Sequence, residues 1–224
     1  MHVIALVAAK DRADTVGTTA AALAALPRVE SVVVVDDGAT DETARVAAAA
    51  GAKVIRLPRN LGKGGAVAAG VAATPHADVY LLVDADVGPT AARADTLLRP
   101  VLDGDADMSV AVLPGAGGRG GFGLVRTLAG AGITRACGFR ARAPLSGQRA
   151  VTAALLRGVD LAPRFGLETA LTIDAVRAGA RVIEIDVALE HRHSGRTLAG
   201  FAHRAGQGRD IVMALAPRLV GARR

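Results

Sequence analysis

Short apolar runs alternate with segments of helical character through the first ninety residues of this 224-residue chain. The runs are rich in Val, Ile, Leu and Ala, and they predict strands at Val3–Ala9, Ser31–Val35, Lys53–Leu57 and Asp78–Val83. The segments between them predict helices over 14–26, 40–50 and 66–73. This spacing is typical of βα units, so we expect an α/β fold with a mostly parallel sheet and helices on both faces.

The rest of the chain follows a less regular pattern. A helix at 90–102 and a strand at 108–113 are expected first, and then a loop at 114–123, where six of ten residues are glycine. Beyond the loop, the pattern predicts one strand, at 181–185, and helices at 124–137, 149–157, 165–178 and 198–215. Because no internal repeat or long linker is visible, we expect a single domain, 1–224, made of two halves, 1–113 and 114–224.

Composition narrows the classes of partner. The net charge of +6 favours an anionic partner such as a nucleotide, a phosphorylated molecule or a membrane surface. Aromatic residues make up only 2% of the chain, which argues against stacking on single-stranded nucleic acid. The single Cys137 permits no internal disulfide, and neither a signal peptide nor a long apolar span is visible. We therefore expect a cytoplasmic protein that does not bind nucleic acid.

Two carboxylates, Asp84 and Asp86, follow directly on the apolar run that begins at Tyr80. Ligands of open α/β sheets bind beyond the carboxyl ends of the strands, which is where these side chains fall. At positions i and i+2 of an extended chain they point to the same side, and carboxylate oxygens suit Mg²⁺ or Mn²⁺. The alternative is that Asp86 closes a turn and Asp84 is a solvated strand end.

Two more loops fall at the same edge of the predicted sheet. Asp36 and Asp37 end the second strand, where a carboxylate can bind a nucleobase or ribose, or can form an ordinary turn. Residues 59–65 are glycine-rich, precede a helix and contain Lys63, which suits a phosphate group. This loop matches neither the Walker nor the dinucleotide fingerprint, and an exposed lysine at a helix start is the alternative.

Taken together, VVVVDDGATDET (32–43), LPRNLGKGGA (57–66) and LLVDAD (81–86) resemble GT-A fold glycosyltransferases of family 2, a likeness that covers 3–112. The resemblance implies a nucleotide-sugar donor, with its base near Asp36 and Asp37 and its diphosphate near Lys63. It also implies that the metal lies at Asp84 and Asp86, where the cation would act as a Lewis acid on the departing diphosphate. The donor set implied in this way is Ala8, Asp11, Asp36, Asp37, Lys63, Asp84 and Ala85, and Asp86 is a catalytic candidate.

The second half resembles the acceptor side of the same family. Within LSGQR (145–149), Ser146, Gly147 and Arg149 are expected to bind the acceptor, although Ser146 could simply cap a helix. FGLET (165–169) is similar to the acidic motif of the family, which makes Glu168 the candidate general base. Inverting members usually have Asp where this chain has Thr169, so Glu168 could instead be a helix N-terminal residue stabilised by the dipole.

EHRHSGR (190–196) resembles the H-R-x-R segment of glucosyl-3-phosphoglycerate synthases, where a histidine joins the metal. His191 is the expected third ligand, with His193 as the alternative. Arg192 and Arg196 are expected to bind the phosphate of an acceptor, unless they form a solvated basic face.

The activity implied is metal-dependent transfer of a sugar from a UDP- or GDP-sugar to a phosphorylated acceptor. The acceptor is either a small phosphoacid or a polyprenyl phosphate, as in dolichol-phosphate mannosyltransferases. An ionised phosphate could attack without a base, which would account for Thr169. A sugar-phosphate nucleotidyltransferase and a non-catalytic nucleotide-sugar-binding protein stay open as alternatives. So do a homodimer and a peripheral contact of the C-terminal basic helix with the inner face of a membrane.

Overall fold

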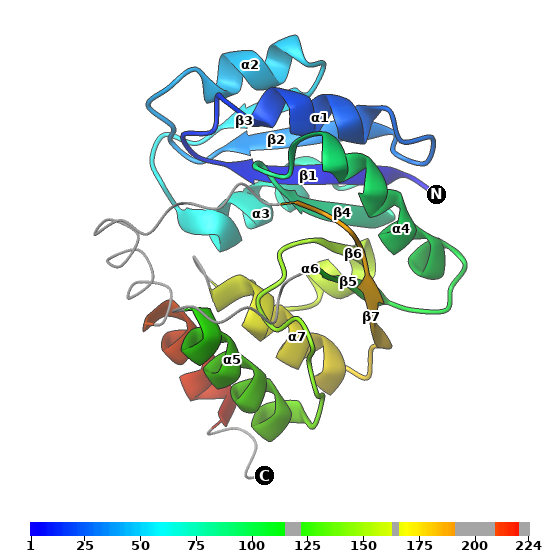
Figure 1. Cartoon of the computed structure of the whole chain (residues 1–224), viewed down its shortest axis with the longest axis vertical. Coiled ribbons are helices and arrows are strands. Elements are labelled where there is room, and N and C mark those ends of the chain that lie inside the picture. The colour runs from blue at the N-terminus through cyan, green and yellow to red at the C-terminus, as the bar shows by residue number, and fades with distance from the viewer. Residues whose placement is uncertain (115–121, 163–165, 191–208, 220–224) are drawn as a thin grey trace.

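The computed structural model describes residues 1–114, 122–162, 166–190 and 209–219. Seven strands form one sheet, in the order β3-β2-β1-β4-β6-β5-β7 (Figure 1). Neighbouring strands are parallel except β6, which is antiparallel to both β4 and β5. The strands are β1 Val3–Ala9, β2 Ser31–Asp36, β3 Lys53–Arg56, β4 Val79–Asp84, β5 Met108–Val112, β6 Arg149–Thr152 and β7 Val182–Asp186. The predicted α/β class and mostly parallel sheet are therefore confirmed.

Helices cover both faces of this sheet, because its strands are apolar on both sides. Val3, Ala5 and Val7 of β1 pack toward α1, α2, η1 and α4, whereas Ile4 and Leu6 pack toward α3, α6 and α7. The helices of the first face are α1 Val16–Ala24, α2 Thr43–Ala49, the 3₁₀ helix η1 Gly88–Ala94 and α4 Asp95–Leu102. Those of the second face are α3 Gly62–Ala73, α6 Ala153–Arg157 and α7 Leu167–Arg177.

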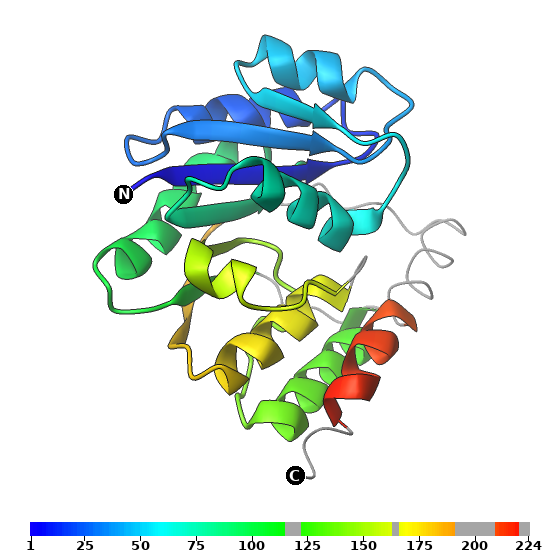
Figure 2. The same ribbon diagram turned by 180° about the vertical axis from the view of Figure 1, so that it is seen from behind.

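A third layer of helices lies beyond α7. Helix α5 (Phe122–Cys137) and the helix at 209–219 lie side by side there, as seen from both directions (Figures 1 and 2). Ile133 of α5, Ile173 of α7 and Leu215 share one buried cluster. Gly132 permits the close approach, since a Cβ atom there would lie 2.5 Å from a methyl group of Leu215. Among the described helices, none is long and apolar enough to cross a membrane.

The predicted helix at 149–157 is wrong in its first part. Arg149–Thr152 form β6, which fills the space between β4 and β5, and the helix starts only at Ala153. Thr152 marks this boundary, because its hydroxyl accepts a hydrogen bond from the amide of Leu155 at 3.4 Å and so caps α6. The second half of the chain thus contributes a strand to the middle of the sheet.

Two other boundaries differ from expectation. Helix α3 begins at Gly62, so Lys63 belongs to its first turn and not to a preceding loop. The segment expected as one helix at 90–102 is divided into η1 and α4. Of the basic helix expected at 198–215, residues 198–208 lie outside the described residues, and 209–219 are helical.

Candidate active site

The carboxyl ends of β1, β2 and β4 meet at one edge of the sheet. Ala8 of β1 lies opposite Asp84 of β4, and Ala9 lies opposite Asp36 of β2. The parallel register therefore brings the acidic ends of two strands to the two sides of β1, as the sequence predicts.

Asp37 is the residue that holds the start of helix α3. Its buried carboxylate accepts hydrogen bonds from the amides of Leu61, at 2.6 Å, and Gly62, at 2.8 Å. Amides in the first turn of a helix have no partner within the helix, so Asp37 satisfies them from a distant part of the chain. Asp37 thereby fixes the position of Lys63, which comes next in the helix.

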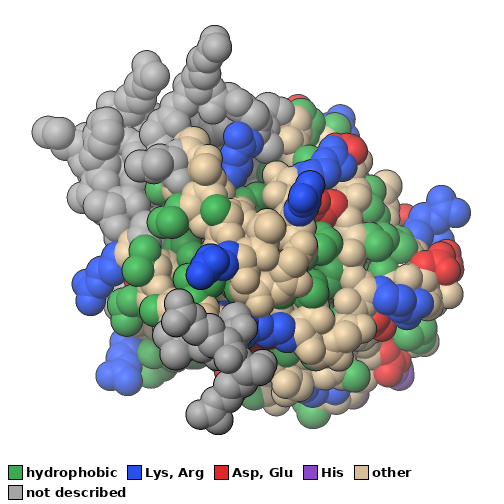
Figure 3. All heavy atoms as spheres, turned by 90° about the horizontal axis from the view of Figure 1, so that it is seen from below, with side chains coloured by type: hydrophobic (Ala, Val, Ile, Leu, Met, Phe, Trp, Pro, Cys, Tyr) green, Lys and Arg blue, Asp and Glu red, His purple; other side chains and the backbone are tan. Residues whose placement is uncertain are grey.

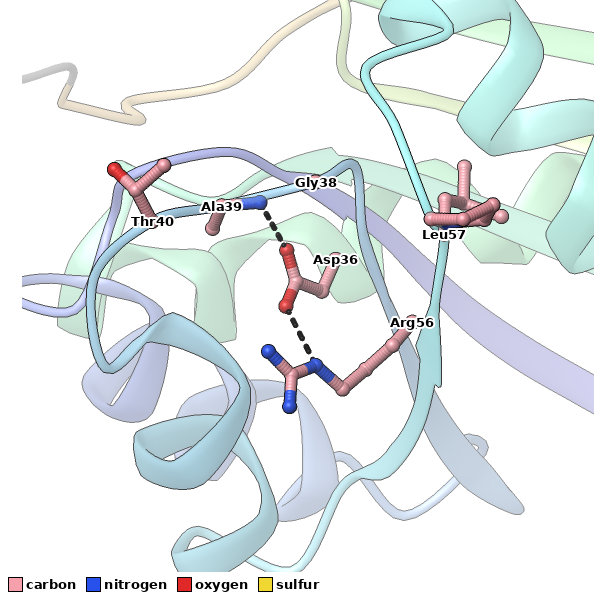
Figure 4. A pocket seen from close by; sticks show the side chains of 7 residues that line it. Asp36, Gly38, Ala39, Thr40, Arg56 and Leu57 are labelled. Atoms are coloured by element: carbon pink, nitrogen blue, oxygen red, sulfur yellow. Dashed lines mark hydrogen bonds and ion pairs between the residues drawn. The ribbon is translucent and has the colours of Figure 1, made fainter.

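Asp36 lies at the wall of a cavity of about 610 Å³ (Figure 4). Its carboxylate accepts a hydrogen bond from the amide of Ala39 at 2.7 Å and faces Nε of Arg56 at 3.3 Å. The Arg56 side chain is 69% exposed, whereas that of Asp36 is 2% exposed. Sequence reasoning missed Arg56, although its position at the end of β3, opposite Asp36, was a usable signal. The cavity is lined by Asp36, Gly38, Ala39, Thr40, Arg56, Leu57 and Pro58.

Asp11 joins the loop after β1 to the loop after β2. One of its carboxylate oxygens accepts a hydrogen bond from the amide of Thr40 at 2.8 Å, and the other pairs with Lys10 at 2.9 Å. The hydrogen bond from Lys10, followed by that from Thr40, lowers the pKa of Asp11 to about 2. With φ at +51°, Asp11 has a left-handed backbone, which Asp tolerates better than most residues. The contact shapes one side of the cavity.

Lys63 is the centre of the charged cluster. Its ammonium group pairs with Asp84 and also lies 2.7 Å from Glu168, in the first turn of α7. Burial alone would lower the pKa of Lys63, but the two carboxylates outweigh burial and raise it. Lys63 therefore stays protonated and links an element of each half of the chain.

Gly147 and Gln148 complete the surroundings of Asp84. The side-chain amide of Gln148 donates to Oδ2 of Asp84 at 2.7 Å, and its carbonyl accepts from the Asp84 backbone amide at 2.8 Å. A Cβ atom at Gly147 would lie 2.2 Å from Nζ of Lys63 and 2.7 Å from an oxygen of Asp84. No residue larger than glycine fits there without displacing these groups. The motifs of the sequence predict no role for Gln148.

Arg149 lies in the protein interior, so the structure does not support the expected contact with an acceptor phosphate. Its side chain points between β6 and α7, donating to the carbonyl of Ser146 and to the hydroxyl of Thr172, both at 2.9 Å. It is 1% exposed, and burial lowers its pKa to about 10 against the attraction of Glu168 and other carboxylates. Among the described residues, the hydroxyls of Ser146 and Thr169 are buried without a hydrogen-bond partner.

The candidate metal ligands are only partly described. Asp84 and Asp86 are half-buried at the end of β4, and Ala85 between them is held by a hydrogen bond from Thr19 to its carbonyl at 3.0 Å. His191, with His193, Arg192 and Arg196, lies outside the described residues. Within the described part of the chain, no three His, Cys, Asp or Glu residues form a metal-binding cluster. The carboxylate pair fits a hard cation, because carboxylate oxygens are the ligands that Mg²⁺ and Mn²⁺ prefer and each can accept from more than one partner.

A GT-A sheet that carries these motifs at its carboxyl edge defines a class of sugar-transferring proteins. The chain belongs to glycosyl transferase family 2, whose family model matches residues 5–154. Among curated proteins, glucosyl-3-phosphoglycerate synthase of Mycolicibacterium paratuberculosis is 31% identical over 192 residues, which cover 74% of this chain and 57% of that protein. The synthase of Mycolicibacterium smegmatis is 32% identical over 167 residues, or 65% of this chain and 54% of that protein.

Solved structures agree with this assignment. Glucosyl-3-phosphoglycerate synthase from Mycobacterium tuberculosis, in complex with Mg²⁺ and uridine diphosphate, has a TM-score of 0.83 at 25% identity, covering 97% of this chain and 79% of that one. Another structure of that enzyme, with Mn²⁺, UDP-glucose and phosphoglyceric acid, has a TM-score of 0.80 at 24% identity, with the same coverage of both chains. The predicted GT-A fold and family are confirmed, and the chain spans little more than half the length of the curated relatives it matches.

Proposed function

We propose that this protein transfers a sugar from a UDP-sugar, with UDP-glucose the first candidate, to a small phosphorylated acid such as 3-phosphoglycerate. The observation that carries this proposal is the position of Lys63, a partly buried cation held between Asp84 and Glu168 at the carboxyl edge of a GT-A sheet. A fixed positive charge of this kind suits the diphosphate of a donor. The names of the relatives support the choice of donor and acceptor.

The donor would lie along the edge of the sheet. Its nucleoside fits the cavity beside Asp36 and Arg56, and its diphosphate meets Lys63 near the end of β4. The strands β2 and β4 are two strand spacings apart, about 10 Å, which a ribose and its phosphates can bridge. Because Asp37 is bonded to amides of α3, its part is to hold Lys63 in place, and Arg56 is better placed to contact the base.

Mg²⁺ or Mn²⁺ is the proposed cofactor, held by Asp86, Asp84 and His191. When bound, it would supply Lewis-acid stabilisation of the charge that grows on the departing diphosphate. The protein's own contribution is electrostatic, since Lys63 is fixed and protonated before the donor arrives. The carboxylate of Glu168 is paired with that ammonium, so we assign Glu168 the role of orienting Lys63 in place of a general base.

The acceptor would bind through the second half of the chain. Arg192 and Arg196 are the proposed phosphate ligands, with Ser146 and Gly147 close to the donor side. Structures of the Mycobacterium tuberculosis enzyme with phosphoglyceric acid or glycerol 3-phosphate support a small phosphorylated acceptor. A polyprenyl phosphate has no comparable support.

The test is turnover by the purified chain with Mn²⁺. UDP-glucose or GDP-glucose is combined with 3-phosphoglycerate, glycerol 3-phosphate or a polyprenyl phosphate in vesicles, and nucleotide release is compared with acceptor-free controls. We expect acceptor-dependent release of UDP with 3-phosphoglycerate. A melting temperature that no nucleotide-sugar raises in the presence of metal would contradict the proposal. Pyrophosphate release from UTP and glucose 1-phosphate would identify a nucleotidyltransferase, and donor binding without turnover would identify a binding protein.

We propose a cytoplasmic site of action, in line with the single cysteine, and we retain the homodimer and a peripheral membrane contact as proposals. The described part of the C-terminal helix buries Ile211 and Leu215 against α5 and α7, and its exposed large apolar residues are Val212 and Met213. Among the described residues, the basic side chains at the end of the molecule that carries this helix are scattered and form no continuous patch (Figure 3). Packing on the domain is therefore the better-supported role of the helix.

A further inference from the structure

Gln148 is fully buried, and both polar atoms of its side chain form hydrogen bonds with Asp84. It is 0% exposed, its amide nitrogen donates to Oδ2 of Asp84, and its carbonyl oxygen accepts from the backbone amide of the same residue. These two bonds fix both the backbone and the carboxylate of Asp84. With Lys63 on Oδ1, each carboxylate oxygen of Asp84 has a partner that sets its direction.

The segment that carries Gln148 is expected on the acceptor side by family resemblance. Its contacts in the structure are instead with the donor side. Gly147 lies against the Lys63 ammonium and the Asp84 carboxylate, so closely that a methyl group would overlap with both. The strand that follows, β6, pairs antiparallel with β4, opposing Leu82 to Arg149 and so placing Gln148 beside the end of β4.

We propose that Gln148 is a positioning residue for the donor site: it holds Asp84, and through Asp84 the ammonium of Lys63, in the orientation that receives the nucleotide-sugar diphosphate and its metal. This role rests on the proposed function. It makes Gly147-Gln148 the inner wall of the donor pocket, with the acceptor bound by other residues.

A side-chain amide is suited to holding Asp84. Glutamine donates to a carboxylate without adding charge, so Asp84 remains the anionic partner of Lys63. A glutamate in its place would add a third carboxylate to the two, Asp84 and Glu168, that already face the Lys63 ammonium, and a methionine would fill the space without a donor.

The first experiment needs no ligand. Urea unfolding of the wild type, Gln148→Met, Asp84→Asn and the double variant forms a double-mutant cycle. We expect the two losses of stability to be less than additive, because both single variants disturb the same hydrogen bond, the one from the Gln148 side-chain amide to Oδ2 of Asp84. Strictly additive losses would contradict the proposal that Gln148 holds Asp84 in place. The control is Ser109→Ala, which removes a buried hydrogen bond from β5 to the carbonyl of Leu97. Its loss of stability and that of Gln148→Met should be additive in the double variant.

The second experiment measures the effect of Gln148 on donor and acceptor binding. For wild type, Gln148→Met, Gln148→Glu and Ser109→Ala, KM is determined separately for UDP-glucose and for 3-phosphoglycerate, with the Mn²⁺ dependence of UDP binding. We expect both Gln148 variants to raise the donor KM roughly tenfold or more and to leave the acceptor KM within about twofold, since one hydrogen bond to a charged group is involved. A raised acceptor KM with an unchanged donor KM would overturn the inference. If the wild type itself binds no nucleotide-sugar, the proposed function fails, and the donor role of Gln148 fails with it. Additive losses in the double-mutant cycle would instead reject only the positioning of Asp84 by Gln148.

Discussion

The ammonium group of Lys63 lies 2.7 Å from a carboxylate oxygen of Glu168. Lys63 belongs to the first turn of α3 and Glu168 to the first turn of α7, so this pair joins the two halves of the chain across the edge of the sheet. Two carboxylates share the one cation, and neither Asp84 nor Glu168 is more than about a quarter exposed.

Replacing Lys63 by Met should abolish most of the activity and lower stability. Asp84 and Glu168 would then face each other without a counter-charge, so we expect kcat/KM to fall about 100-fold or more and stability to fall by about 2 kcal/mol. Steady-state kinetics and urea unfolding measure the two effects. Lys53→Met, an exposed lysine at the opposite edge of the sheet, is the matched control. Near-normal turnover by Lys63→Met would remove Lys63 from the site.

Gly147→Ala should weaken donor binding more than it weakens the fold. The added methyl group would lie 2.2 Å from Nζ of Lys63, and the flexible lysine can yield only by moving away from Asp84. We expect the rise in melting temperature caused by UDP and Mn²⁺ to shrink to less than half. Gly130→Ala in α5, where an added methyl has only ordinary contacts, should leave that rise unchanged. Equal responses of the two variants would argue against the close approach.

Asp86→Ala should remove the metal-dependent part of donor binding. If Asp86 carries the cation, UDP should raise the melting temperature of this variant equally with Mn²⁺ and with EDTA, whereas the wild type responds more strongly with Mn²⁺. Asp103→Ala, an exposed carboxylate after α4, serves as the control. A variant that retains the full Mn²⁺ effect would place the metal elsewhere.

Thr172→Val and Thr169→Val should differ, although both hydroxyls are buried in the same helix. The Thr172 hydroxyl accepts a hydrogen bond from Arg149 at 2.9 Å, so its loss leaves a buried guanidinium donor unsatisfied and should cost about 1–3 kcal/mol. The Thr169 hydroxyl has no hydrogen-bond partner in the described part of the chain, so its replacement should be neutral or stabilising. Equal losses in urea unfolding would contradict the structural role of Arg149.

Lowering the pH should weaken the stabilising contact that Asp11 makes with Lys10 and Thr40. The folded state lowers the pKa of Asp11 to about 2 from 3.8, so the contact stabilises the protein fully above pH 4 and loses its effect as the pH falls toward 2. Asp11→Asn lacks this titration and tolerates the same backbone conformation. We therefore expect its melting temperature to fall less than that of the wild type between pH 4.5 and 2.5. A parallel fall in both proteins would show that Asp11 is not involved. The effect should be small, since the side chain is largely exposed.

Most of the structure of residues 1–113 follows from the sequence, because periodicity and the ends of strands are local signals. The apolar runs gave β1 to β4, and the acidic residues after β2 and β4 fell at one edge, as parallel strands require. The role of Asp37 could not be found in this way. Its carboxylate serves amides 24 and 25 residues away, a contact that depends on how the loop folds back.

In residues 114–224, less of the structure can be predicted from the sequence. Arg149–Thr152 is a strand of four residues that begins with an arginine, so local preference gives only a weak sign that it enters the middle of a sheet. A helix over 149–157 does not place Gln148 beside Asp84, and it leaves Arg149 available for the acceptor phosphate and not for the interior. Tertiary packing decides all three, and the one available signal was the pair of β-branched residues, Val151 and Thr152, after the LSG turn.

The position of β6 has a consequence for how the polypeptide can be divided. A fragment that ends at residue 113 would contain every donor motif but would leave β4 with an uncovered edge, since β6 separates it from β5. During synthesis, β4 therefore lacks its second neighbouring strand until residue 152 has left the ribosome. The charged cluster around Lys63 is in this sense not a module that evolution or an engineer could transplant alone, because Gly147, Gln148 and Glu168 belong to segments translated long after the others.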